Sequence, residues 1–184
     1  ADVGPLPAGA TPTTTNTVQA GNTTVFSLFI KNNDSANNSY ALSASSANSF
    51  PGTLPAGWTV KFVAGNVTAA NCAAAAAITT TAPVGGNTQT QVTACVTVPA
   101  SQTAVTAQPL YFQVKSTAVA SNGNIVVDVK LDAVTVTNNV LSATLGPATS
   151  NGQTTPGGSV VYPQTLTNTG NAACTGPYTV TATL

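Results

Sequence analysis

Short runs of alternating apolar and polar residues, separated by turn-forming residues, fill most of the chain after residue 16. A period of two is typical of strands that bury one face, whereas an amphipathic helix places apolar residues three or four positions apart. β-branched residues dominate these runs, and no helical periodicity is sustained. The pattern predicts seven strands, at Thr17–Gln19, Thr24–Lys31, Tyr40–Ser45, Trp58–Ala64, Thr88–Val98, Gln108–Ala118 and Ile125–Thr137.

The run 125–132 predicts one buried and one solvated face. We expect its charged positions to lie in water; a ligand site on that face is the alternative. The same parity places Trp58 and Phe62 in the core and Lys61 outside, with a Trp58 exposed for stacking on a sugar as the alternative. The apolar set is Ile125, Val127, Val129 and Leu131, and the charged set is Asp128, Lys130 and Asp132.

Two segments depart from the strand pattern. Residues 1–16 contain three Pro and two Gly, which predicts a linker or N-terminal extension. The alanine run Cys72–Ile78 is the helix candidate, but it is short and has no cap, so we expect a connection or an edge segment.

An internal repeat relates residues 20–34 to residues 156–170, an offset of 136 positions. Gly158 and Gly170 fall where chain reversals are expected, so we predict positive φ there. The repeat predicts one complete module at 17–137, a linker at 138–149 and the start of a second module at 150–184. The matched pairs are Gly21 with Gly157, Val25 with Val161, Phe26 with Tyr162, Ile30 with Leu166, Asn32 with Asn168 and, after two more residues of slippage, Tyr40 with Tyr178.

The turn motifs resemble those of a family of bacterial cell-surface repeats. Pro156-Gly157-Gly158 precedes an apolar strand that ends in Asn168-Thr169-Gly170-Asn171, and Leu54-Pro55-Ala56-Gly57-Trp58 precedes another strand. The resemblance implies an all-β, immunoglobulin-like antiparallel sandwich, secretion, and tandem arrays in long surface proteins. The family carries no catalytic residues to transfer.

The supply of chemically active side chains is very small. The chain has four Lys and four Asp and lacks Arg, Glu, His and Met. General acid–base chemistry and most metal sites draw on His, Glu or Cys, so we expect no enzyme activity, no cofactor and no metal. A Ca²⁺ ion held by Asp and carbonyl oxygens stays open as an alternative. Without a basic patch, we expect no nucleic-acid partner.

The composition also favours an extracellular location. No apolar run approaches the ~20 residues of a membrane-spanning helix, and charged residues make up 4% of the chain, against about a quarter in average proteins. The opening residues lack a signal-peptide pattern, so we expect a removed leader or a fragment.

Three cysteines are present, and we expect a disulfide between Cys72 and Cys95, with two free buried thiols as the alternative. The partner of Cys174 would lie beyond the chain or in another chain. Candidate glycosylation sites are Asn22, Asn33, Asn37 and Asn66.

Two functions fit these observations. The first is a structural module of a surface layer, stalk or filament, whose partners are other copies, the rest of a longer chain, or other surface proteins and glycans. In that case residues 150–184 would be ordered only when packed against further polypeptide. One form of this hypothesis is strand complementation, in which a neighbouring subunit supplies the missing strands. The alternative is an adhesin or carbohydrate-binding module. The positions of Trp58, Tyr111 and Tyr178 discriminate between the two, because buried aromatics favour a scaffold and clustered exposed ones favour sugar binding.

Overall fold

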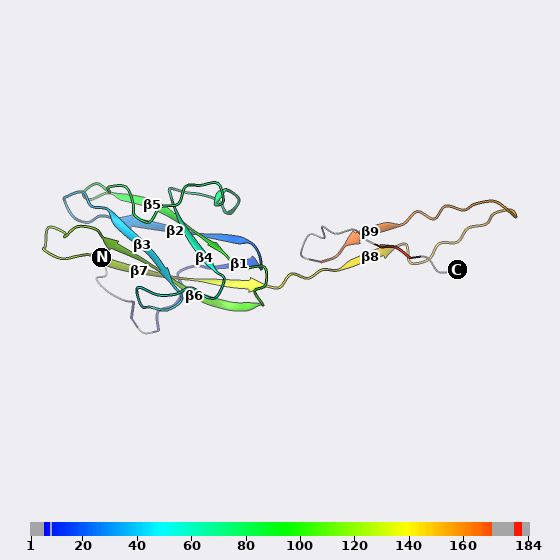
Figure 1. Ribbon diagram of the computed structural model, residues 1–184, viewed down its shortest axis with the longest axis horizontal. Helices are drawn as coiled ribbons and strands as arrows, with labels where there is room; N and C mark the ends of the chain where they lie inside the picture. The colour runs from blue at the N-terminus through cyan, green and yellow to red at the C-terminus, as the bar shows by residue number, and fades with distance from the viewer. Residues whose placement is uncertain (1–5, 8, 171–178, 182–184) are drawn as a thin grey trace. The chain divides into compact units, whose positions relative to one another are not determined.

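The computed structural model describes residues 6–7, 9–170 and 179–181. The chain divides into a first unit, Ala1–Asn138, and a second unit, Asn139–Leu184 (Figure 1). Regular structure in the described residues consists of nine strands and one short 3-10 helix, η1, at Ala69–Asn71. None of the helical structure described is long and apolar enough to cross a membrane. The fold class is therefore all-β, as predicted.

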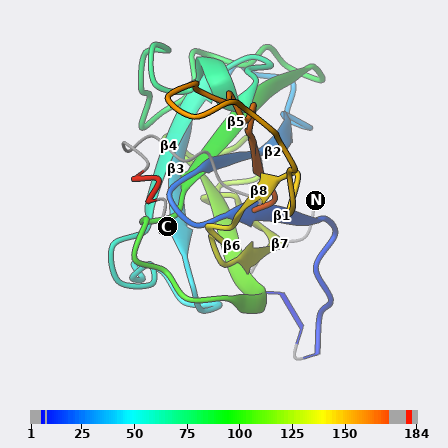
Figure 2. The same cartoon turned by 90° about the vertical axis from the view of Figure 1, so that its right-hand side faces the viewer.

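The first unit is a sandwich of two sheets. All seven predicted strands are present, and their ends differ from the predicted ones by three residues at most. β1 pairs in parallel with β7, and the other pairs are antiparallel. In Figure 2, β5 of one sheet lies at the top of this unit, and β6 and β7 of the other lie at the bottom. One sheet has the order β1 (Thr15–Gln19), β7 (Val127–Thr137), β6 (Val105–Ser116), β3 (Tyr40–Ser45), and the other has the order β2 (Thr23–Lys31), β5 (Gln89–Thr97), β4 (Thr59–Ala64).

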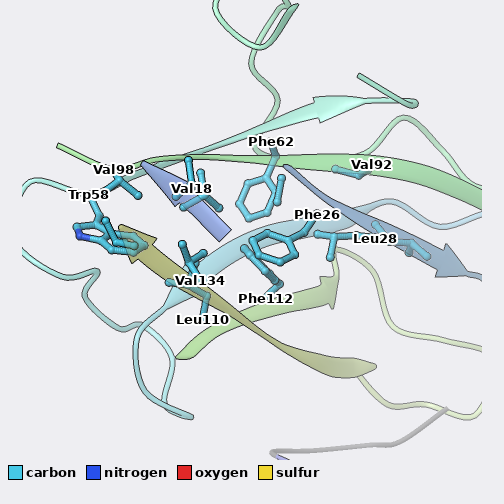
Figure 3. Packing of buried hydrophobic residues seen from close by; sticks show 14 of the residues in the cluster. Val18, Phe26, Leu28, Trp58, Phe62, Val92, Val98, Leu110, Phe112 and Val134 are labelled. Atoms are coloured by element: carbon cyan, nitrogen blue, oxygen red, sulfur yellow. The ribbon is translucent and has the colours of Figure 1, made fainter. Parts of the chain in front are cut away.

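Aromatic rings fill the space between the two sheets. The Phe112 ring from β6 lies 5.6 Å from the Phe26 ring and 6.3 Å from the Phe62 ring, centroid to centroid. Trp58 lies beside Val98 at one end of this core (Figure 3). Its side chain is 5% exposed, and its Nε1 donates a hydrogen bond to Gln102 Oε1 at 2.8 Å. The predicted core positions Trp58 and Phe62 are confirmed.

The predicted faces of β7 are wrong in part: Val129 and Leu131 are buried as expected, but Ile125 is 37% exposed and Asp132 is 0% exposed. Asp132 lies opposite Leu110, and Lys130 lies opposite Phe112. Directly opposed residues of an antiparallel pair point to the same side, so these charged side chains lie on the face that packs against the other sheet, with Asp132 buried and Lys130 half-buried. Lys130 Nζ accordingly reaches Ser27 O of β2, in the other sheet, at 3.3 Å.

Alternation could not identify the inner face of β7, because both of its faces are buried. Val129 and Leu131, on the face opposite to Asp132, are 5% and 4% exposed, and Asp132 itself is 0% exposed. Lys130 Nζ forms an ion pair with Asp132 Oδ2 at 2.7 Å, and Thr14 N donates to Asp132 Oδ1 at 3.0 Å. The ion pair and the hydrogen bond make burial of this carboxylate tolerable.

The predicted linker 1–16 is partly built into the sandwich. Its last two residues belong to β1, and Thr13 N donates to Leu131 O at 2.8 Å. Further upstream, Asn48 Nδ2 donates to Leu6 O at 2.9 Å. The described part of this segment is thus attached to the first unit by hydrogen bonds.

The long connection between β4 and β5 closes one side of the sandwich. Ile78 bridges to Phe62 of β4, and Thr80 bridges to Ala41 of β3, so this segment passes from one sheet to the other. Cys72 and Cys95 form the predicted disulfide, with a Cα–Cα distance of 6.0 Å. The alanine run is a connection with an edge contact, as expected.

The second unit contains a two-stranded antiparallel pair, β8 (Ala143–Gly146) and β9 (Thr165–Asn168). β8 falls within residues 138–149, where the sequence predicted a linker; four residues of weak alternation gave no strand signal. Apolar side chains of this unit are exposed: Leu145 by 45%, Val161 by 85%, Leu166 by 41% and Val180 by 65%.

Two turns recur at equivalent positions of the repeat. Gly21 and Gly157 have φ values of 86° and 82°. Asn32 Oδ1 accepts a hydrogen bond from the backbone N–H two residues later, at 3.0 Å, and Asn168 Oδ1 does the same at 2.9 Å. The positive φ expected at Gly158 occurs at Gly157 instead, one residue earlier, and Gly170 does not have it either.

Candidate functional site

A cavity of about 340 Å³ opens between two loops at one end of the first unit. One loop, residues 32–39, connects β2 to β3, and the other, residues 117–126, connects β6 to β7. The volume falls within the usual range of small-molecule sites, about 300–1,000 Å³. We call this hollow the loop cavity; it is lined by Lys31, Asn32, Asn33, Asp34, Asn38, Tyr40, Ala120, Ser121, Asn122 and Val126.

Asp34 holds the two loops together. Its Oδ2 accepts a hydrogen bond from Ser121 N at 2.6 Å, and its Oδ1 accepts one from Ser121 Oγ. Oδ1 also accepts from the backbone N–H groups of Ser35 and Ala36, at 2.7 and 3.4 Å. Hydrogen bonds to the charged form, above all that from the Ser121 hydroxyl, lower the pKa of Asp34 to about 2.

Two buried asparagines hold the loops in place through side-chain hydrogen bonds. Asn32 Nδ2 donates to Ala36 O at 2.8 Å and to Val84 O at 3.0 Å, which ties its own loop to the β4–β5 connection. Asn38 Nδ2 donates to Ala118 O at 3.1 Å, and Asn38 Oδ1 accepts from Ala118 N at 3.3 Å. These amides thus supply hydrogen-bond partners to backbone groups of both loops.

Tyr40 forms the floor of the loop cavity. It is the first residue of β3, its side chain is 5% exposed, and its partner across the strand pair is Ser116. Within the described residues its hydroxyl has no hydrogen-bond partner, yet the oxygen is not sealed from solvent. Burial and then the negative charge of Asp34 raise the pKa of Tyr40, so the group stays a neutral hydroxyl at physiological pH.

These groups suit binding better than proton transfer. The carboxylate of Asp34 already accepts five hydrogen bonds and stays ionised near neutral pH, so it is a poor general acid or base. The described residues hold no cluster of three or more His, Cys, Asp or Glu side chains that could ligate a metal. What the loop cavity offers is amide groups, one phenol hydroxyl and an ammonium group at its rim.

The site residues predicted from the sequence lie in several places. The cysteine pair holds the β4–β5 connection on the outer side of β5, where Val63 and Cys95 form a small second core. All four candidate glycosylation sites are exposed, and Asn33 and Asn37 belong to the loop that carries Asp34. Trp58 is buried and Tyr111 is half-buried. Cys174 and Tyr178 lie outside the described residues.

The sequence analysis did not identify the loop cavity. The signal was present, because Asn32-Asn33-Asp34-Ser35 and Ser121-Asn122-Gly123-Asn124 are both rich in turn-forming polar residues. Nothing in either segment indicates that the other lies beside it. The contact between Asp34 and Ser121 joins residues 87 positions apart.

Comparison with known proteins gave no relative: no family model matches the chain, and no curated protein sequence matches it. The fold and the site therefore define only a class, a disulfide-bonded all-β sandwich with a cavity between two loops.

Proposed function

We propose that this chain is a structural module of an extracellular bacterial surface protein, one that contributes immunoglobulin-like units to a surface layer, stalk or filament. The observation that carries the proposal is the repeated pair of turns, Gly21 with Asn32 and Gly157 with Asn168, which has the same backbone signature in both units. A repeated strand and turn is the mark of modules in tandem.

Three further features support an extracellular scaffold. Charged residues make up 4% of the chain, so the exposed surface depends on Thr, Ser, Asn and Gln for its polarity. The Cys72–Cys95 disulfide is compatible with an oxidising environment. Trp58, a candidate for stacking on a sugar, is buried in the core, which favours the scaffold over a sugar-stacking surface.

The exposed apolar side chains of the second unit support a proposal of strand complementation. In the first unit, the part of β2 that corresponds to β9 pairs with β5, from Phe29 opposite Gln91 to Lys31 opposite Gln89. β9 pairs with β8 instead, and Leu166, the counterpart of the buried Ile30, is 41% exposed. We propose that a strand like β5 covers this surface in the assembled protein, contributed by the rest of a longer chain or by a neighbouring subunit.

Hydrogen exchange of the full chain at two concentrations tests this assembly. In dilute solution, where the chain is monomeric by light scattering, residues 17–137 should be protected and residues 150–184 should exchange rapidly. Raising the concentration should bring protection of residues 150–184 together with larger particles. A dilute monomer with residues 150–184 fully protected would contradict strand complementation.

The surface location needs its own experiment. An antibody raised against the first unit should label intact cells of the source bacterium, and brief protease treatment of those cells should remove the signal. Labelling that appears only after the cells are lysed would refute the surface function, whatever the hydrogen exchange shows.

A further inference from the structure

β2 is an edge strand of its sheet, so one side of its backbone faces away from β5. Asn32 N donates to Thr88 O just beyond the end of the β2–β5 pair. The direction of the backbone groups alternates along an antiparallel pair, so the even-numbered residues of β2 bond to β5. The odd-numbered residues 25, 27, 29 and 31 therefore turn their N–H and C=O groups toward the open side.

Side chains from the other sheet cap the first part of this open side. Val25 O accepts a hydrogen bond from Asn16 Nδ2 of β1 at 2.8 Å, and Ser27 O accepts one from Lys130 Nζ of β7 at 3.3 Å. Such caps hinder the addition of a further strand, which an unprotected strand edge would invite. The cover of β2 thus extends from its start to Ser27.

The cover ends before Phe29 and Lys31. Among the described residues, no hydrogen bond reaches the outward backbone groups of these two residues, and a hollow of about 80 Å³ runs along residues 28–31. The Phe29 side chain is 64% exposed, more than any other large apolar side chain described in the first unit. By contrast, Ile78 bridges to β4, the other edge strand of this sheet. The end of β2 is therefore suited to pairing with an additional strand.

Residues 27–31, Ser-Leu-Phe-Ile-Lys, are complementary to themselves when two copies run antiparallel with Phe29 opposite Phe29. Outward residues then meet outward residues, so the two backbones satisfy each other. On the exposed face the two Phe29 rings form a cross-strand aromatic pair, and on the core face Leu28 lies opposite Ile30 of the second copy. Lys31, the single charge of this stretch, lies opposite Ser27 of the second copy, so like charges are not opposed.

We infer that two copies of the chain associate through residues 27–31 of β2, antiparallel about a twofold axis at Phe29, so that their three-stranded sheets become one continuous sheet. The interface uses the same residues on both copies, so it closes as a dimer. It is short compared with the ~800 Å² that each partner buries in a standard interface, so the dimer is weak and forms at high concentration. This surface goes beyond the proposed strand complementation, because it does not involve residues 150–184.

Hydrogen exchange of single amides in the full chain, followed by NMR at micromolar and millimolar concentration, tests the inference. In the dilute monomer the amides of Phe29 and Lys31 should exchange rapidly, whereas those of Leu28 and Ile30, which bond to β5, should be protected throughout. At millimolar concentration the Phe29 and Lys31 amides should become protected as well. The inference is overturned if they still exchange rapidly there, or if they are already protected in the dilute monomer.

Charged variants at the twofold axis test the register. Phe29→Lys and Phe29→Asp should each weaken the dimer at least about tenfold, followed through protection of the Lys31 amide, because like charges are then directly opposed and the aromatic pair is lost. An equimolar mixture of the two variants should recover association, since opposite charges then meet. Thr59→Lys, on the other edge strand of the same sheet, is the matched control and should dimerise like the wild type.

Two results with these variants would overturn the inferred interface: either single variant dimerising as tightly as the wild type, or a mixture associating no better than its components. The concentration-dependent protection of residues 150–184 should persist in all of the variants. Failure of the β2 interface is therefore distinguishable from failure of strand complementation.

Discussion

Replacement of Lys130 by Met removes the cation that pairs with the buried Asp132 carboxylate. The Asp132 side chain is 0% exposed and points toward the core beside Leu110, with Lys130 Nζ at 2.7 Å and Thr14 N at 3.0 Å from its oxygens. Met keeps the aliphatic stem of Lys130, so core packing changes little. The carboxylate, however, loses its partner ammonium.

Removal of one partner from a buried ion pair costs roughly 3–5 kcal/mol. The Lys130 side chain is 31% exposed, so water already screens part of the attraction. We therefore expect the lower end of the range, about 3 kcal/mol. Such a loss is a large fraction of the ~5–15 kcal/mol that stabilises a typical domain.

Urea unfolding at pH 7 measures this loss. The chain has a single tryptophan, Trp58, and it lies in the core of the first unit, so its fluorescence reports on that unit alone. The double variant Lys130→Met with Asp132→Leu should recover most of the stability, because an apolar pair replaces a buried ion pair at little net cost. If Lys130→Met alone costs less than about 0.5 kcal/mol, the reasoning is refuted, and the charged face of β7 lies in water.

Three other outcomes are expected. The lowered pKa of Asp34 means that this group contributes stability above pH ~4 that is lost as the pH falls toward about 2, so Asp34→Asn should reduce the fall of the melting temperature between pH 4 and pH 2. A variant whose melting temperature falls as steeply as that of the wild type would contradict the role of Asp34 in joining the two loops. Cys95→Ser should cost roughly 3 kcal/mol in non-reducing thermal unfolding, since the disulfide closes a loop across 23 positions, and a reductant should then have no further effect. Phe112→Ala should cost about 3–5 kcal/mol in urea unfolding, whereas Phe29→Ala, at a side chain 64% exposed, should cost under about 0.5 kcal/mol.

Alternation along the chain was sufficient to place the strands of the first unit, but not their faces in every case. At β4 the prediction succeeded because Phe62 points into the core while Lys61 reaches the connection outside, donating to Ala73 O and Ala75 O at 3.1 and 2.9 Å. At β7 it failed because a lysine and an aspartate that satisfy each other can lie inside, while Val129 on the other face is buried as well. Periodicity reports polarity, whereas burial depends on which partners the fold provides.

The candidate site was beyond reach of the sequence for a different reason. The contact between Asp34 and Ser121 joins two loops, and loops carry no periodicity that would predict their relative position. Tyr40 was correctly predicted to lie in a strand. The sequence does not show, however, which loops lie beside the start of that strand.

Comparison of the two aligned segments separates the features that both units share from those found beside the loop cavity. Asn32 and Asn168 occupy equivalent positions and make the same turn, so this turn is part of the module itself. Asp34 corresponds to Gly170, which has no side chain to clasp a second loop. A second module of this kind would keep the turn and lack the carboxylate that holds the loop cavity together. The contact between Asp34 and Ser121 is thus a feature of the first unit, whereas the asparagine turn occurs in both units.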